Sequence, residues 1–248
     1  EAVDRPRVPP VAEEPDPGAM QALFELLKEA ASPVAIVGGA DWSPRASHHF
    51  ANFAFRYGIP VAAAFRRQDA IANSCGVYAG QLGYGPNPKL QQRIRDADLI
   101  LAIGPRLGEA TTDGYTLITP DHPGQTLVHV HPDPNELGHV YHADLPICAD
   151  MGEFAEMVDE WIDPDLVRFS CGEDAHKEWL EWSEPKPRPK EDGSVALDLG
   201  PCVAAMREKL PENTIICNGA GNFSGWWHRY WRYGPMPTQL APTSGTMG

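Results

Sequence analysis

Asp98-Leu-Ile-Leu-Ala-Ile-Gly104 is the stretch that decides the fold, because it is a short, uninterrupted apolar run that ends at a glycine. A run of this kind predicts a strand that is buried on both faces of a parallel sheet. Similar runs lie at 33–39, 59–64, 126–131 and 145–148. Segments with helical spacing separate most of them, so the sequence predicts an α/β fold on a doubly wound parallel sheet, Rossmann-like in layout.

Helices are expected on either side of these strands. An amphipathic helix is predicted to begin near Pro17, where apolar residues recur at three- and four-residue spacing. Further helices are predicted over residues 45–57, 87–95 and 152–161. Residues 65–88 are predicted to be a loop, because glycine and proline recur throughout them.

Changes in composition divide the chain into four parts. Residues 1–18, rich in proline and acidic side chains, are predicted to be a linker from a missing N-terminal domain. The sheet-forming central domain is placed at 19–162. Residues 163–195, polar and proline-rich, are predicted to be a tether with one short helix. Residues 196–248 are expected to be the truncated start of a second α/β domain, since about 50 residues are too few for an independent core.

Composition limits the partners that the protein could have. The 248 residues carry a formal net charge of −14, which argues against nucleic acid. No apolar run reaches the roughly 20 residues that a membrane-spanning helix needs. The five cysteines form no CxxC pair, which predicts a reducing compartment, and no metal site is predicted within the sequence. The aromatic residues and arginines over 226–233 are therefore assigned to helix packing or a subunit interface.

Two glycine-containing stretches near the end of the chain could carry chemistry. Gly219-Ala-Gly221 follows a predicted strand over 214–217 and precedes a predicted helix that begins at Asn222. This layout can present free backbone N–H groups to an anion, although it can also be a turn that needs glycine for its backbone angles. Pro242-Thr-Ser-Gly-Thr-Met-Gly248 adds hydroxyl groups and open backbone about twenty residues further on.

These two stretches carry a family resemblance. Residues 213–248 resemble the start of the diphosphate-binding domain of thiamine diphosphate enzymes of the acetolactate synthase group. The resemblance implies contacts to the cofactor diphosphate and to its rings. The diphosphate side is implied for Ala220, Gly221, Asn222 and Phe223, and the ring side for Gly245, Thr246 and Met247. Met247 matches the methionine that, in this family, wedges under the cofactor and bends it into a V shape.

The central part of the chain resembles the central domain of the same enzymes. Ile103-Gly-Pro-Arg-Leu-Gly108 and His129-Val-His-Pro-Asp-Pro-Asn-Glu-Leu-Gly138 are similar to the ends of two of its strands. Some members bind FAD there, others bind ADP or nothing. The residues that could contact a nucleotide follow predicted strands, at the edge where an open α/β sheet binds ligands. They are Gly38, Gly39, Arg106, His131 and Asp133.

The resemblance implies an activity and a set of partners. The implied parent protein is a cytoplasmic bacterial enzyme, a homodimer or homotetramer, that decarboxylates 2-oxo acids and joins the product to a second carbonyl compound. It would use thiamine diphosphate and Mg²⁺. The metal ligands and a catalytic glutamate are expected outside this chain, which is expected to be inactive alone. Two alternatives remain: a family member with other lyase or oxidase chemistry, and a non-catalytic module that binds FAD or ADP.

Overall fold

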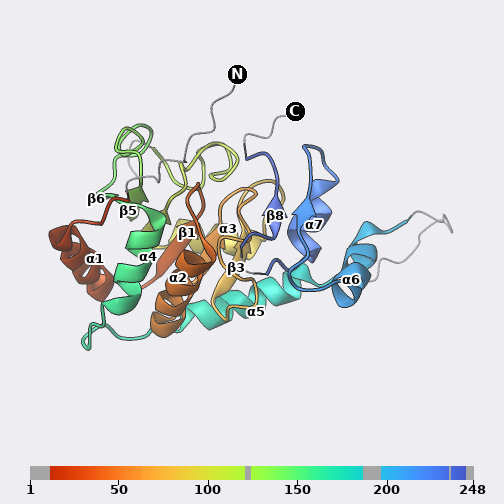
Figure 1. The fold of residues 1–248 in the computed structure, drawn as a ribbon, viewed down its shortest axis with the longest axis horizontal. Helices are drawn as coiled ribbons and strands as arrows, with labels where there is room; N and C mark the ends of the chain where they lie inside the picture. Colours follow the sequence, from red (N-terminus) through yellow and green to blue (C-terminus); the bar gives the residue numbers. More distant parts are fainter. Residues whose placement is uncertain (1–11, 121–123, 187–196, 235, 244–248) are drawn as a thin grey trace, which may run out of the picture.

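The computed structural model describes residues 12–120, 124–186, 197–234 and 236–243 (Figure 1). A parallel six-stranded sheet in the order β3-β2-β1-β4-β5-β6 forms its centre. The strands are β1 (Pro33–Val37), β2 (Val61–Ala63), β3 (Tyr78–Gln81), β4 (Leu99–Ile103), β5 (Thr126–His131) and β6 (Leu145–Cys148). This order reverses direction at β1 and β4, as in a doubly wound fold, so the predicted fold class is confirmed.

Helices cover both faces of the sheet. On one face lie α1 (Pro17–Glu29), α2 (Pro44–Tyr57) and α4 (Met151–Glu160), and on the other lies α3 (Pro88–Asp96). Three of these helices begin with proline after a capping side chain: Asp16, Ser43 and Asn87 each accept a hydrogen bond from a backbone N–H in the first turn. Proline tolerates this position because its missing N–H would have no partner within the helix.

The sheet separates two buried cores. Leu99, Leu101 and Ile103 of β4 pack in the core beneath α1, α2 and α4, while Ile100 and Ala102 pack in the core beneath α3. Successive strand residues point to opposite faces, so a strand covered on both sides must be apolar at every position. This requirement explains the uninterrupted run in the sequence.

The prediction that residues 65–88 form a loop was wrong in one place. Tyr78–Gln81 form β3, which pairs with β2 at the edge of the sheet. Trp179 lies edge-on to the ring of Tyr78, with the ring centroids 4.8 Å apart. Trp179 belongs to α5 (Cys171–Ser183), which lies within the part predicted to be a tether and packs against β3. The strand was missed because glycines flank and interrupt it. The four-part division itself remains a prediction.

A smaller unit follows at the end of the molecule opposite α1 (Figure 1). It contains α6 (Leu199–Lys209), β7 (Ile216–Cys217), α7 (Ser224–Tyr230) and β8 (Gln239–Leu240). β7 and β8 pair in parallel, and Val203, Ile216 and Trp231 share a separate apolar cluster. Aromatic residues of 226–233 are thus used in packing, as predicted. Among the helices that the structure describes, none is long and apolar enough to cross a bilayer.

Candidate functional site

The glycines predicted to contact a nucleotide lie where β1 ends, but they are packed against neighbouring loops. A Cβ atom on Gly39, whose φ is +76°, would lie 1.9 Å from the carbonyl oxygen of Gly104. A Cβ on Gly38 would lie 2.6 Å from the Cβ of Ala64. Both positions therefore need glycine because the loops after β1, β2 and β4 touch there. The two glycines do not form an open cradle for a nucleotide.

The other three residues of that group lie together at the same edge of the sheet. Arg106 forms an ion pair with Glu136 at 3.2 Å and is largely exposed. The His131 ring nitrogen Nδ1 lies 3.0 Å from the backbone N–H of Asp133, which donates to it. Hydrogen bonds from Asn135, first from its backbone N–H and then from its side chain, lower the pKa of the Asp133 carboxyl. These polar groups have partners in the loops that follow β4 and β5, and the described residues do not support a flavin site.

The loop predicted to contact a diphosphate has a different character. It runs from Asn218 at the end of β7 to Ser224 at the start of α7. Gly221 has φ +143°, which strongly favours glycine, and its carbonyl accepts hydrogen bonds from both the N–H and the hydroxyl of Ser224. The backbone N–H groups of 219–223 make no hydrogen bond with any other described residue, and 221–223 are exposed. Open N–H groups in a row fit an anion such as a diphosphate.

Parallel pairing of β7 and β8 brings the residues that follow them, 219–223 and 241–243, to one edge. Asn218 donates its backbone N–H to Leu240 at 3.0 Å, immediately before the two segments diverge. Residues 219–223 follow β7, and 241–243 follow β8. Ala220, Gly221, Asn222 and Phe223 are in the described loop, whereas Gly245, Thr246 and Met247 lie outside the described residues. Their contacts, including the wedge predicted for Met247, stay a prediction.

Arg66 is a site residue that the sequence did not reveal. It follows β2 in a left-handed conformation with φ 57° and reaches from the central domain to the smaller unit. Its Nη1 donates to the carbonyl oxygen of Pro242 at 2.7 Å, and its Nη2 donates to that of Gly219 at 3.3 Å. One side chain thus contacts both described loops, 219–223 and 241–243. The only signal in the sequence was a charged pair, Arg66-Arg67, directly after an apolar strand.

A buried polar cluster fixes β8 to the central domain beside Arg66. Oδ2 of Asp69 accepts the backbone N–H groups of Thr238 and Gln239, each at 3.0 Å. The side-chain amide of Gln68 donates to the carbonyl oxygen of His228 at 2.8 Å. These contacts join residues about 160 to 170 positions apart in the chain and hold the smaller unit in one orientation.

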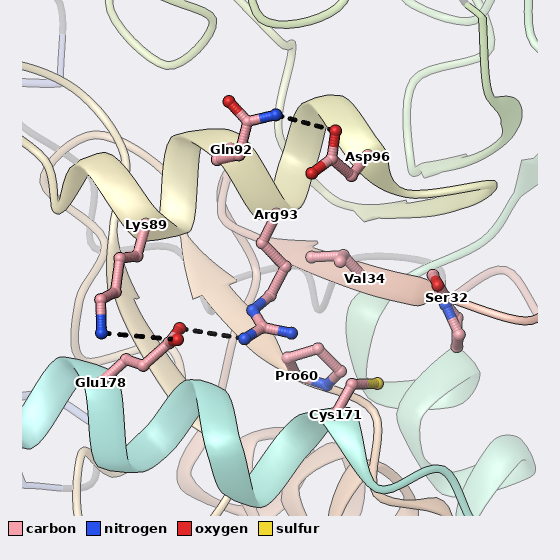
Figure 2. Close-up of a pocket in the computed structure, with 10 residues that line it drawn as sticks. Ser32, Val34, Pro60, Lys89, Gln92, Arg93, Asp96, Cys171 and Glu178 are labelled. Atoms are coloured by element: carbon pink, nitrogen blue, oxygen red, sulfur yellow. Dashed lines mark hydrogen bonds and ion pairs between the residues drawn. The ribbon is translucent and has the colours of Figure 1, made fainter.

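A cavity of about 340 Å³ lies elsewhere, at the edge where the strands begin. Figure 2 shows Arg93 of α3 pointing toward Pro60 and Cys171, while Glu178 of α5 pairs with both Arg93 and Lys89. The cavity is lined by the start of β1 and by α3 and α5, and it contains none of the predicted site residues. Ligands of open α/β sheets bind at the opposite edge, so this cavity is separate from the candidate site.

Comparison with known proteins settles the family. Residues 20–158, more than half of the chain, match the family model described as "Thiamine pyrophosphate enzyme, central domain". The chain belongs to the thiamine pyrophosphate enzyme family. The resemblance seen in the sequence is therefore confirmed, and the residues matched agree with the six-stranded sheet and its helices.

Relatives of this thiamine pyrophosphate enzyme chain include several named activities. It is 25% identical to the acetolactate synthase large subunit of Parasynechococcus marenigrum, over 95% of this chain and 37% of that protein. It is 25% identical to a sulfoacetaldehyde acetyltransferase of Castellaniella defragrans, over 88% of this chain and 40% of that protein. The crystal structure of benzoylformate decarboxylase from Polynucleobacter necessarius shares the fold, with a TM-score of 0.67 at 20% identity, over 99% of this chain and 44% of that chain. The chain thus spans less than half the length of these relatives.

His228 gives the site of this family member a testable pH dependence. It is 3% exposed, and burial, followed by the charge of Arg66, lowers its pKa from 6.5 to about 4. Below pH 6.5, His228 is protonated in the unfolded chain but stays neutral in the folded chain. Its contribution to stability is therefore present above pH 6.5 and is lost as the pH falls toward 4.

Between pH 7 and pH 5, we expect the free energy of unfolding to fall by about 2 kcal/mol more in the wild type than in H228L, which lacks the titrating group. Urea unfolding at both pH values measures this difference. H48Q, at an exposed histidine of α2, is the matched control and should follow the wild type. An identical pH dependence in H228L and the wild type would contradict the prediction.

Proposed function

We propose that this chain is part of a thiamine diphosphate-dependent enzyme that decarboxylates a 2-oxo acid and joins the product to a second carbonyl compound, as the named activity of the acetolactate synthase relatives suggests. The observation that carries the proposal is the open loop over 219–223, which leaves the β7–β8 pair beside 241–243. The resemblance assigns Ala220 to Phe223 in this loop, and Gly245 to Met247, which follow 241–243 in the sequence, to one cofactor.

In this proposal, each segment of the chain has a stated role. When bound, thiamine diphosphate supplies the carbanion chemistry at the carbonyl carbon of the 2-oxo acid. The N–H groups of Ala220, Gly221, Asn222 and Phe223 bind its diphosphate, and Gly245, Thr246 and Met247 contact and bend its rings. A loop of backbone donors is suited to this task because its dipoles are already oriented before the ligand arrives.

The proposal assigns no metal ligand and no proton-transferring glutamate to this chain. Among the described residues, no three His, Cys, Asp or Glu side chains are grouped so as to hold a metal ion. We propose that Mg²⁺ on the diphosphate is bound by other parts of a cytoplasmic homodimer or homotetramer, in keeping with the 37% to 40% of the relatives' length that the chain spans. Without that metal, the loop alone should bind the diphosphate weakly.

Hydrogen exchange of the purified 248-residue chain tests this proposal. Thiamine diphosphate with Mg²⁺ is expected to slow amide exchange in 219–223 at millimolar concentrations, and thiamine, which lacks the diphosphate, should have no effect. Pyruvate should not be turned over. Exchange that is unchanged at any thiamine diphosphate concentration would overturn the proposed cofactor site. Turnover of pyruvate by this chain would contradict the assignment of the metal and proton-transfer groups to other segments.

The relatives named sulfoacetaldehyde acetyltransferase favour a second candidate, a family member that transfers an acetyl group. Assays on sulfoacetaldehyde and on pyruvate, with the protein in its complete cellular form, separate the two candidates. The absorption spectrum of the same preparation tests for FAD directly, because a bound flavin absorbs visible light.

A further inference from the structure

Arg66 is held in an unfavourable backbone conformation, and its side chain is buried. Its backbone is left-handed, which costs a residue with a side chain about 1 kcal/mol. Its guanidinium lies over the ring of Phe65, with the carbon Cζ 4.7 Å from the ring centroid. The residue is 4% exposed, so a long charged side chain has been buried rather than extended into solvent. The left-handed backbone and the buried charge are both unfavourable, so contacts of the guanidinium must offset them.

The guanidinium joins the loops that follow β7 and β8. Nη1 donates to Pro242, which follows β8, and Nη2 donates to Gly219, which follows β7. In the described part of the chain, no other side chain donates to both segments. A guanidinium is planar and carries its donors in a fixed fork, so two carbonyls bound at once are held at a fixed separation. Arg66 therefore sets the spacing between the two loops.

No carboxylate of the described residues forms an ion pair with Arg66. Across 12–120, 124–186, 197–234 and 236–243, no Asp or Glu oxygen lies within 4.0 Å of its guanidinium, and its buried Nε has no hydrogen-bond partner. The nearby His228 is kept neutral by burial and by Arg66 itself. A buried charge without a counter-charge is costly, and an anion bound at the adjoining loops would reduce that cost.

We propose that Arg66 is a positioning residue that locks 219–223 to 241–243, and that its unbalanced charge makes the lock favour a diphosphate group bound at these loops. The lock, meaning the hydrogen bonds of Arg66 to the two loops, is present in the folded chain without any ligand. The identity of the ligand as thiamine diphosphate rests on the proposed function. Free pyrophosphate has the same anionic chemistry, so it probes the charge of Arg66 independently of thiamine.

Hydrogen exchange on four forms of the chain tests the lock. The forms are wild type, R66M, R66K and the matched control R67M, whose wild-type side chain contacts Met236 instead of the two loops. Without ligand, R66M is expected to exchange about tenfold faster at the hydrogen-bonded amides of Ile216 and Asn218, which join β7 to β8 next to the two loops, since the two hydrogen bonds of Arg66 are lost. R67M should match the wild type there. Unchanged exchange in R66M, or an equal increase in R67M, would overturn the lock.

Pyrophosphate then tests the charge. It should protect both loops in the wild type with about tenfold higher affinity than in R66M, and R66K should bind it nearly as well as the wild type. R66K restores the charge without the planar fork, so the amides of Ile216 and Asn218 should still exchange faster than in the wild type when no ligand is present. Equal pyrophosphate affinity in the wild type and R66M would overturn the role of the charge, which a purely structural side chain would not have.

A glycine variant keeps the lock testable if R66M fails to fold. R66G removes the side chain at a position whose φ of 57° suits glycine, so it should keep the fold even where R66M does not. Its amides at Ile216 and Asn218 should exchange as fast as those of R66M. Protection of the wild type by pyrophosphate without any preference for thiamine diphosphate would reject the proposed function and leave the role of Arg66 standing. If R66M instead behaves like the wild type, the proposed role of Arg66 is overturned and the proposed function is left standing.

Discussion

Replacing Asp69 with alanine is expected to destabilise the attachment of β8 to the central domain by about 4 kcal/mol. Asp69 is fully buried, and its Oδ2 is the acceptor for the N–H groups of Thr238 and Gln239. In D69A both donors lose their partner in a place that water does not reach. Each buried donor left without a partner costs about 1–3 kcal/mol, and here there are two. Amide exchange at 238–240 and urea unfolding measure the loss.

Asp98 provides a matched control at the opposite edge of the sheet, where the strands begin. Its two carboxylate oxygens accept the backbone N–H groups of Ala31 and Ser32, but Asp98 is exposed. D98A should therefore cost only about 1 kcal/mol, because water replaces the lost acceptor. D69N keeps an oxygen acceptor and should fall between D69A and the wild type. A loss in D69A no larger than that in D98A would show that water reaches the cluster around Asp69.

The parts of the fold that the sequence predicted are those governed by local pattern. The run from Asp98 to Gly104 is apolar at every position because both faces of β4 are covered, and this pattern is visible without any partner strand. β3 was missed because it is held by β2 and by Trp179 of α5, not by its own composition. Edge strands with glycine take their structure from neighbours that a local reading does not see.

The candidate site divides in the same way. The glycine turn at 219–221 could be predicted, because its need for glycine and its place between strand and helix are local. Arg66 and Asp69 could not, because each acts on backbone atoms about 150 to 180 residues away. Gly38 and Gly39 were assigned to a ligand for a sound local reason, yet the space that they leave is filled by another loop of the same chain.

Substituting Gly39 with alanine should therefore lower the free energy of unfolding by about 4 kcal/mol, from backbone strain together with overpacking. The added Cβ would lie 1.9 Å from the carbonyl oxygen of Gly104, and φ at this position is +76°. Since the obstacle is backbone, no side-chain rotation relieves the contact, and the loops after β1 and β4 must move apart. Urea unfolding without any nucleotide measures the loss, because packing, unlike ligand binding, is present in the free protein.

Gly85 separates the two causes. Its φ of +68° is nearly the same, but a Cβ built on it meets no atom within 4 Å, so G85A carries backbone strain without overpacking. G85A should lose about 1–2 kcal/mol, and the difference between the variants measures how firmly the two loops are packed. If G39A is no less stable than G85A, the loops part easily and room for a nucleotide opens at this edge. If G39A is much less stable, the glycine is needed for packing whether or not a nucleotide is present, because the loss occurs in its absence.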